Sequence, residues 1–553
     1  MRKAGAVEPE TTIVVLAAAL LVVAAAAGFG PRIRIPAPLI LVAVGIGVSA
    51  LPIARGFSLD PQLVLLGILP PLLYASSVSM PAMDLRREFG AVSLLSVVLV
   101  VVSALVLGWV FTLLIPGLPY ALGVALGAVI SPTDAVATTI VQQSKVSHRV
   151  TAILEGESLL NDASALVLLR TALAGAASVS VLGVVGDFAW SLLGAIVIGI
   201  VVGRVTTALR GRVQDPTVNT VLSFTVPFLA SLPAEALNAS GLVAAVAAGL
   251  TVGRRAPRVL SAEHRRSDAA NWRALSLVLE GGIFLLMGLQ ISGIVNAPRT
   301  EGLGLNGILV ALAGLAAVIL VRTVFVTPLL VWLSVRRRHG TGMRDRLERM
   351  QRAIADGEPI DPRGPGAPAP RTDRRRRPMR QVDLDRFSKR IRQVLGDIDY
   401  LAASPLGPRE GAIVVWAGMR GAVTVAAAQT ITDPRWGSLL ILVAFGVAAF
   451  SLLLQGGTLS LLIRLLKPKG DDPAVQQQEH EQVMRLVQEA SDAVVQQEGE
   501  PRKQWALRRV QAARSALLAA RDEGVFSSDV LGAALESLDA TEIAVDLRGG
   551  PEG

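Results

Sequence analysis

The sequence has no cysteine and few charged residues for its length. Of its 553 residues, 18% are charged and 52% are hydrophobic, whereas a typical soluble protein has about a quarter charged residues. The absence of cysteine excludes disulfides, thiolate metal sites and cysteine nucleophiles. Only four histidines are present. Carboxylate, amide and hydroxyl oxygens are therefore the main groups left for binding chemistry.

Long apolar runs dominate the chain between residues 11 and 465. Many are about 17–25 residues long, enough to cross about 30 Å of hydrocarbon. The sequence thus predicts an all-α polytopic membrane protein, and an outer-membrane barrel is excluded because barrel strands alternate in hydrophobicity. We place thirteen spans, at residues 11–29, 36–53, 61–80, 90–115, 119–142, 150–174, 180–208, 217–233, 239–253, 273–295, 304–335, 411–431 and 437–465.

The loop charges predict an orientation. Fifteen Lys and Arg residues lie in the loops on one side and three on the other. The positive-inside rule then predicts an external amino terminus and a cytoplasmic carboxyl terminus, in a bacterial plasma membrane.

Two polar regions accompany the membrane domain of residues 1–335 and 411–465. Residues 336–410 carry 19 basic and 11 acidic residues, most of the net charge of +9. A basic loop beside a membrane more often follows the orientation bias or contacts anionic lipid than binds nucleic acid. Its centre, 361–380, is rich in Pro, Gly and Arg and is predicted to be disordered, with short helices at 343–355 and 384–395. Residues 466–553 are acidic with helical periodicity, which predicts a cytosolic helical tail.

Four carboxylates interrupt the apolar sequence. The fifth span contains "SPTDAVA" with Asp134, and the sixth contains "EGESLLNDAS" with Glu155, Glu157 and Asp162. A charge within the bilayer costs at least a few kcal/mol, so it usually faces a partner or a water-filled cavity. Pairing that only holds helices together explains any one of these acids as well as a functional role does, but explains the whole cluster poorly.

Helical geometry places the acids of the sixth span on two different faces of the helix. Glu155, Ser158 and Asp162 share one face, whereas Glu157 and Asn161 share another. The first face offers oxygens to a cavity, and Glu157 needs its own cation. Two arginines inside predicted spans are candidate partners, and position alone does not choose between them: Arg322 and Arg420.

Two spans are predicted to be broken. Pro132 has no amide hydrogen and its ring clashes with the preceding turn, so the fifth helix should break near Thr133. In the twelfth span, Gly418 and Gly421 flank Arg420. These spans are seven apart, as two inverted repeats would give, and paired interrupted helices mark the ion site of many transporters. Oxygen ligands suit a hard cation such as Na⁺, or protons.

Three motifs together resemble the cation:proton antiporter-1 family, the NhaP- and NHE-type sodium/proton exchangers. They are "SPTDAVA", "EGESLLNDASALV" and "WAGMRGAVTVA", and "LPPLLYASSVSM" and "LEGGIFLLMGLQI" are also similar to family segments. The resemblance covers residues 11–465 and leaves out the insert. It implies two crossed, unwound helices in a core domain that moves against a dimerisation domain in an elevator-like cycle, and hence a homodimer.

The resemblance also implies roles for the site residues. Asp162 would be the exchange carboxylate, with further oxygens from Thr133, Asp134 and Ser158. Asn161 would orient the unwound segment. Glu157 would pair with an arginine, Arg322 being preferred, and Arg420 would neutralise the half-helix ends. Glu155 would lie at the cytoplasmic mouth or in the cavity, and Glu280 is interpreted as structural.

The expected function is exchange of Na⁺, with Li⁺ and K⁺ as alternatives, for H⁺. Asn161 stands where electrogenic relatives carry a second Asp, which implies electroneutral one-for-one exchange and a role in pH and sodium homeostasis. A K⁺/H⁺ antiporter and, less favoured, a cation channel are the competing functions. The expected partners are the cation, the proton, the lipid bilayer and a second copy of the chain. No enzyme activity, cofactor or nucleic-acid partner is indicated.

Overall fold

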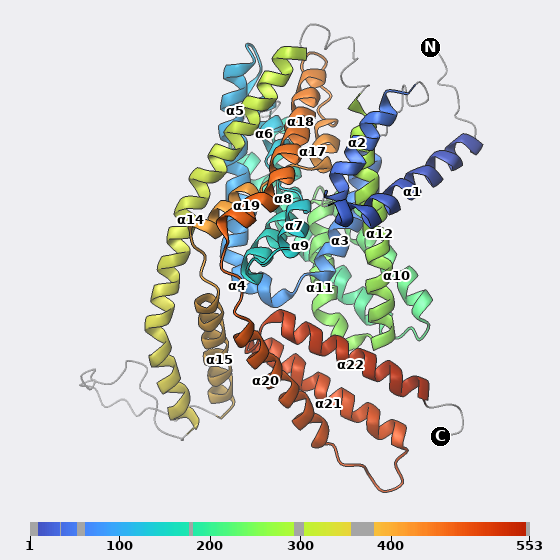
Figure 1. Ribbon diagram of the computed structural model, residues 1–553, viewed down its shortest axis with the longest axis vertical. Helices are drawn as coiled ribbons and strands as arrows, with labels where there is room; N and C mark the ends of the chain where they lie inside the picture. The colour runs from blue at the N-terminus through green and yellow to red at the C-terminus, as the bar shows by residue number, and fades with distance from the viewer. Residues whose placement is uncertain are drawn as a thin grey trace, which may run out of the picture. The chain divides into compact units, whose positions relative to one another are not determined.

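The computed structural model describes residues 9–33, 35–51, 61–175, 181–291, 304–355 and 381–548. Helices make up most of these residues, and none of them is in a strand (Figure 1). Each of the thirteen predicted spans coincides with a helical segment, so the all-α prediction is confirmed. Seven helices in the described part are long and apolar enough to cross a membrane, and shorter apolar helices accompany them. The count of thirteen crossings stays a prediction.

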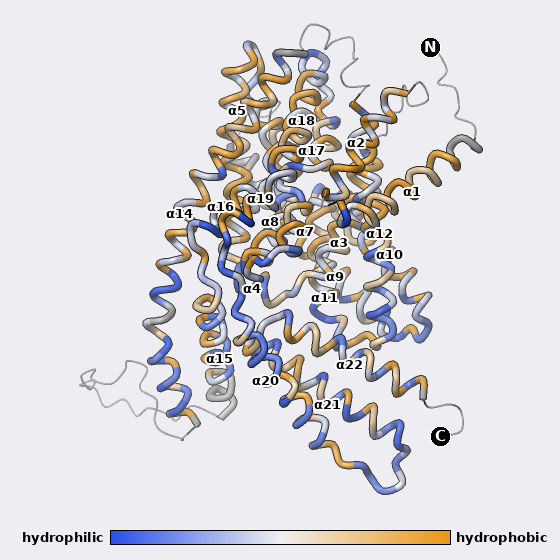
Figure 2. Tube along the Cα trace, viewed as in Figure 1, coloured by the Kyte–Doolittle hydropathy of each residue, from blue (hydrophilic) through white to orange (hydrophobic). Residues whose placement is uncertain are grey.

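The chain divides into two compact units. One, the membrane unit, contains residues 1–146, 150–327 and 409–468, and the other, the polar unit, contains residues 147–149, 328–408 and 469–553. Figure 2 shows the contrast in hydropathy within α14 (Gly304–Ala355), whose first half is apolar and whose second half is polar. The division therefore follows the change in composition along the chain.

Within the membrane unit, one group of helices packs mainly around α11 and α12. Helices α9 and α3 pack on α11, α2 packs on α12, and α10 contacts both. We call this the scaffold group. Its members are α1 (Pro9–Ile33), α2 (Ala37–Ser49), η2 (Leu63–Ile68), α3 (Leu69–Ser79), α9 (Val181–Arg210), α10 (Pro216–Ala236), α11 (Gly241–Val259) and α12 (Ala262–Leu289).

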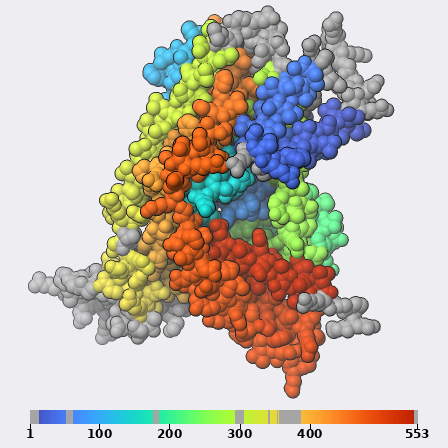
Figure 3. Space-filling view, in the orientation of Figure 1, coloured from blue at the N-terminus to red at the C-terminus, as the bar shows by residue number. Residues whose placement is uncertain are grey.

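The second group of the membrane unit, the bundle group, contains both predicted breaks. Helix α5 packs on α6, and α17 and α18 pack on each other and on α6. On the face seen in Figure 3, the orange α18 and α19 lie beside the blue α1 and α2. The group comprises α4 (Ala82–Ser93), η3 (Leu94–Val98), α5 (Leu99–Leu114), α6 (Tyr120–Ile130), α7 (Val136–Gln142), α8 (His148–Gly175), the first half of α14, α16 (Pro408–Trp416), α17 (Ala422–Ala428), α18 (Gly437–Ser451), η4 (Leu452–Gly456) and α19 (Gly457–Leu466).

Both predicted breaks are present. The fifth span is split into α6 and α7 around Pro132, and the twelfth is split into α16 and α17 around Arg420. The first break follows from the missing amide hydrogen of Pro132. Glycines flank the second, where a helix loses little by unwinding because glycine favours the helical state weakly.

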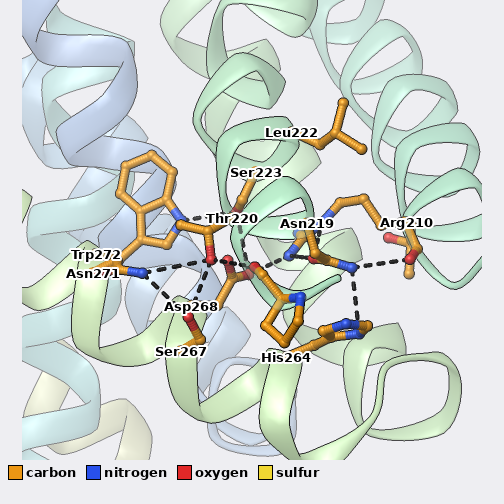
Figure 4. A network of polar contacts seen from close by, with 12 residues as sticks. Arg210, Asn219, Thr220, Leu222, Ser223, His264, Ser267, Asp268, Asn271 and Trp272 are labelled. Atoms are coloured by element: carbon orange, nitrogen blue, oxygen red, sulfur yellow. Dashed lines mark hydrogen bonds and ion pairs between the residues drawn. The ribbon is translucent and has the colours of Figure 1, made fainter. Parts of the chain in front are cut away.

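The scaffold group contains a buried polar network of its own (Figure 4). Arg210, at the end of α9, forms an ion pair with Asp268 of α12. It also donates two hydrogen bonds to Oδ1 of Asn219 on α10, at 2.9 and 2.7 Å. Ser223 donates to the same Asp268 carboxylate and accepts from the Trp272 indole. The network joins three helices at one end of the scaffold.

The polar unit contains a three-helix bundle: α20 (Pro473–Asp492), α21 (Arg502–Glu523) and α22 (Ser528–Arg548) pack on one another, and α15 (Gln381–Ala403) packs on α21. Gly524 ends α21 in the left-handed conformation that favours glycine. The helices predicted at 384–395 and in the tail are present, whereas residues 343–355 are not a separate short helix but the end of the continuous α14. The segment predicted to be disordered, 361–380, lies outside the described residues.

Replacing Asp268 with Asn should destabilise the protein. The buried guanidinium of Arg210 would lose its ion-pair partner within the described residues, and breaking a buried pair in this way costs about 3 kcal/mol or more. Thermal unfolding in detergent, followed by tryptophan fluorescence, should show a lower midpoint for Asp268→Asn. The control Asp187→Asn, at an exposed position of α9, should unfold like the wild type. Equal midpoints for both variants would contradict a stabilising role for the network.

Candidate functional site

The two helix breaks meet through the backbone. The amide of Asp134, in the first break, donates a hydrogen bond of 2.8 Å to the carbonyl of Met419 in the second. Both residues lie between helix ends, where backbone groups have lost their helical partners. This bond joins the two unwound segments into one junction.

The two carboxylate oxygens of Asp134 face different segments: one faces the start of α7, and the other faces the second break. Oδ1 accepts a hydrogen bond of 2.9 Å from the amide of Val136, at the start of α7. A Cβ added to Gly421 would lie only 1.2 Å from Oδ2. Glycine is therefore required at 421 because the carboxylate occupies the space of a side chain.

Asp162, on α8, is the second acid of the junction. The Asp134 and Asp162 carboxylates are near enough for their negative charges to repel each other. The side chain is half-buried, and within the described part of the chain it has no hydrogen-bond or ion-pair partner. Ser158, one turn earlier on the same face, is buried. Among the described residues, no arginine forms an ion pair with Asp134 or Asp162.

Glu157, on the other face of α8, is buried and paired with an arginine. It forms an ion pair with Arg322 of α14, with 2.8 Å between Nη2 and Oε2, and both side chains are at most 2% exposed. Arg322 also donates two hydrogen bonds to the carbonyl of Val414, at the end of α16. Of the two candidate arginines, Arg322 is thus the partner of Glu157. The pair ties α8, α14 and α16 together.

A short hydrogen-bond chain fixes the orientation of Asn161. The hydroxyl of Thr133 has one proton, which it donates to Glu157 at 3.3 Å, so it accepts from the amide nitrogen of Asn161 at 2.7 Å. The amide oxygen of Asn161 must then face away from Thr133. Among the described residues, that buried oxygen has no hydrogen-bond donor. The arrangement leaves one neutral oxygen free beside Asp162.

Arg420 lies in the second break and reaches the first. Its guanidinium donates to the carbonyls of Ile130 and Ser131, at 2.8 and 3.4 Å, at the carboxyl end of α6. That helix end carries a partial negative charge, which a cation neutralises. The arginine therefore stabilises the interrupted helix rather than pairing with an acid.

Two further acids lie near this region. Glu155, near the start of α8, accepts a hydrogen bond from Gln142 at the end of α7. Glu280, on α12 of the scaffold group, is exposed and interacts electrostatically with Asp134. From the sequence, Glu280 is expected to be structural, with the dimer interface or the cavity as its alternative places. An acid in the middle of an apolar helix was the available signal.

The site offers carboxylate, amide and hydroxyl oxygens: Asp134 and Asp162, Asn161 and Ser158. Among the residues that the structure describes, no Lys or Arg side chain pairs with the Asp134 or Asp162 carboxylate, so each can take a proton or contribute to a metal site. Hard cations prefer such oxygens. Chemically, the junction can bind a small cation or a proton.

Comparisons with known proteins agree with this geometry. The family model described as sodium/hydrogen exchanger, transmembrane, matches residues 16–357, which is more than half of the chain. An uncharacterized Na⁺/H⁺ exchanger of Mycobacterium tuberculosis is 33% identical over 301 residues, 54% of this chain and 55% of that protein. The sodium, potassium, lithium and rubidium/H⁺ antiporter of Bacillus subtilis is 31% identical over 272 residues, 47% of this chain and 41% of that protein.

A solved structure has the same fold. The sodium proton antiporter MjNhaP1 from Methanocaldococcus jannaschii aligns with 83% of this chain and 100% of its own, with a TM-score of 0.58 and 18% identity. The chain spans about half the length of the curated relatives it matches first. The family match, the fold and the two joined breaks agree: the chain belongs to the sodium/hydrogen exchanger family.

Proposed function

We propose that the protein is a secondary antiporter that exchanges a monovalent cation for protons. The observation that carries this proposal is the pair of acids at the junction, Asp134 and Asp162, which have no basic partner among the described residues. Relatives with matching sequence are named as Na⁺/H⁺ exchangers and antiporters, which supports the same function here.

The mechanism is competition for one carboxylate. Asp162 is the exchange carboxylate, and it binds either a proton or the cation because each neutralises the same charge. Thr133, Asp134 and Ser158 supply further oxygens, and Asn161 orients the unwound segment through its hydrogen bond to the Thr133 hydroxyl. Since neither ion binds while the other is bound, movement of one drives movement of the other.

The remaining site residues hold the junction. Glu157 and Arg322 fasten α8 to α14 and α16, and Arg420 neutralises the end of α6. Glu155 lies near the start of α8, in the proposed orientation its cytoplasmic end, where it guides ions toward the site. These charges are paired or hydrogen-bonded, so they do not compete with Asp162 for the transported ion.

The transported cation is Na⁺, with Li⁺ and K⁺ as further substrates. The relative of Bacillus subtilis is named for sodium, potassium, lithium and rubidium, and oxygens alone discriminate weakly between these ions. With one exchange carboxylate and the neutral Asn161 beside it, exchange is one for one and electroneutral. The protein serves sodium and pH homeostasis.

The membrane arrangement follows the loop charges. The amino terminus is outside and the insert, the tail and the carboxyl terminus are cytoplasmic, in the plasma membrane of a bacterium. The protein works as a homodimer through the scaffold group, and the bundle group moves against it in an elevator-like cycle. No cofactor takes part.

Transport should be visible in everted vesicles with a fluorescent pH dye. Pulses of Na⁺, Li⁺ and K⁺ should each give cation-dependent proton movement if the cation and the proton share Asp162. Because one-for-one exchange moves no net charge, clamping the membrane potential should leave the rate unchanged. A current without proton movement would indicate a channel instead.

Replacing Asp162 with Asn should abolish exchange, since the amide neither takes up nor releases a proton at neutral pH and carries no negative charge for the cation to neutralise. The same dye assay should then show no cation-dependent signal, although the protein is present in the membrane in normal amount. Asp187→Asn, at an exposed position of α9, is the matched control and should exchange normally. Persisting sodium-dependent proton movement in Asp162→Asn would reject this residue as the exchange carboxylate.

Replacing Gly421 with Ala should impair the site, because the new Cβ would lie 1.2 Å from Oδ2 of Asp134 and would push the carboxylate away. We expect the maximal rate to fall about tenfold or more, as misplaced catalytic or binding groups commonly do. Gly457→Ala, at the start of α19 where a Cβ meets nothing within 4 Å, is the matched control. Similar rates for both variants would contradict the placement of Asp134 against Gly421.

A further inference from the structure

A buried polar pair on the last membrane helices contacts the second break. Ser451, at the end of α18, and Gln455, in η4, are both 0% exposed. The Gln455 side chain donates a hydrogen bond of 3.1 Å to the carbonyl of Trp416 and accepts one of 2.6 Å from the Ser451 hydroxyl. That hydroxyl accepts from the amide of Arg420 at 2.9 Å. Three hydrogen bonds thus form one relay.

The relay satisfies backbone groups that the break exposes. Trp416 is the last residue of α16, and Arg420 lies in the unwound segment that follows. The amide of Arg420 is buried and the carbonyl of Trp416 is half-buried, and a buried backbone group without a partner costs about 1–3 kcal/mol. Neither group can find water in the packed bundle, so the polar side chains of the neighbouring helix replace it.

The helix that carries the pair is itself irregular. Residues 452–456 form a π-helical turn, and such turns occur frequently at functional sites. A leucine-rich helix would pack without a buried serine and glutamine, whose desolvation needs compensation. The break between α16 and α17 supplies that compensation, and within the described part of the chain these two side chains form no hydrogen bonds outside the relay.

The first break has a comparable support. Glu157 and Asn161, four residues apart on α8, hold Thr133. Ser451 and Gln455 are also four residues apart, on the helix that follows the second break. Each break is thus held by a buried polar pair on the next helix, and the second pair is uncharged.

We propose that Ser451 and Gln455 are positioning residues of the cation site. They fix the unwound segment after Trp416, in which the Met419 carbonyl accepts from the Asp134 amide and Gly421 lies against Oδ2 of Asp134. A shift of this segment moves the surroundings of Asp134 directly. The pair therefore sets the affinity for the cation without touching it, an inference that rests on the proposed exchange function.

The test measures the sodium concentration that gives half-maximal exchange, in vesicles. Ser451→Ala removes the hydroxyl, and Gln455→Met keeps the length of the side chain but removes both hydrogen bonds. Each variant loses two buried hydrogen bonds and should raise the half-maximal sodium concentration about tenfold or more. Ser451→Thr keeps a hydroxyl and should restore the wild-type value. Ser438→Ala, on the same helix outside the relay, should leave it unchanged.

The outcomes separate positioning from mere stabilisation. A lower unfolding midpoint with an unchanged half-maximal concentration in Ser451→Ala and Gln455→Met would overturn the proposal, as would failure of Ser451→Thr to rescue. If the wild type itself shows no exchange, the proposed function fails. In that case the role of Ser451 and Gln455 is tested by how much Na⁺ raises the midpoint of thermal unfolding. Loss of that increase in the two variants, but not in Ser438→Ala, supports the role, and an equal increase overturns it.

Discussion

Interrupted helices at membrane depth are stable only where each freed backbone group finds a partner inside the protein. The bundle group meets this requirement with very few residues. Arg420 donates hydrogen bonds to the carbonyls at the end of α6, and Arg322 donates to the carbonyl of Val414. The amide of Asp134 donates to the carbonyl of Met419. Because these partners come from the other break or from a neighbouring helix, neither interruption could persist without the second.

This constraint separates the buried charges into two kinds. Glu157, Arg322 and Arg420 each form several hydrogen bonds. Moving any of them would leave backbone or side-chain groups without a hydrogen-bond partner. Asp134 uses one carboxylate oxygen for the amide of Val136, and Asp162 uses none within the described part. The groups that hold the junction are therefore distinct from the groups that can change their protonation or bind an ion.

The elements that depend on local chemistry could be predicted from the sequence. Pro132 and the glycines beside Arg420 predict both breaks, and helical spacing separates the face of Asp162 from that of Glu157. Contacts between distant segments could not be predicted. Position alone does not choose between Arg322 and Arg420 for Glu157. Ser451 and Gln455 read as ordinary polar residues in an apolar run, and the network of Arg210 and Asp268 requires knowledge of which helix ends meet.

The balance of charge at the junction bears on the stoichiometry. Three carboxylates meet two guanidinium groups there: Asp134, Asp162 and Glu157 against Arg322 and Arg420. With these five ionised and Glu280, which interacts with Asp134 from the scaffold group, protonated, one negative charge remains, and an isolated excess charge in the bilayer is costly. A single proton or a single monovalent cation removes it, whereas two would create a positive excess. Since the second break is held by the uncharged Ser451 and Gln455 rather than by another acid, this count agrees with the proposed exchange of one ion for one proton.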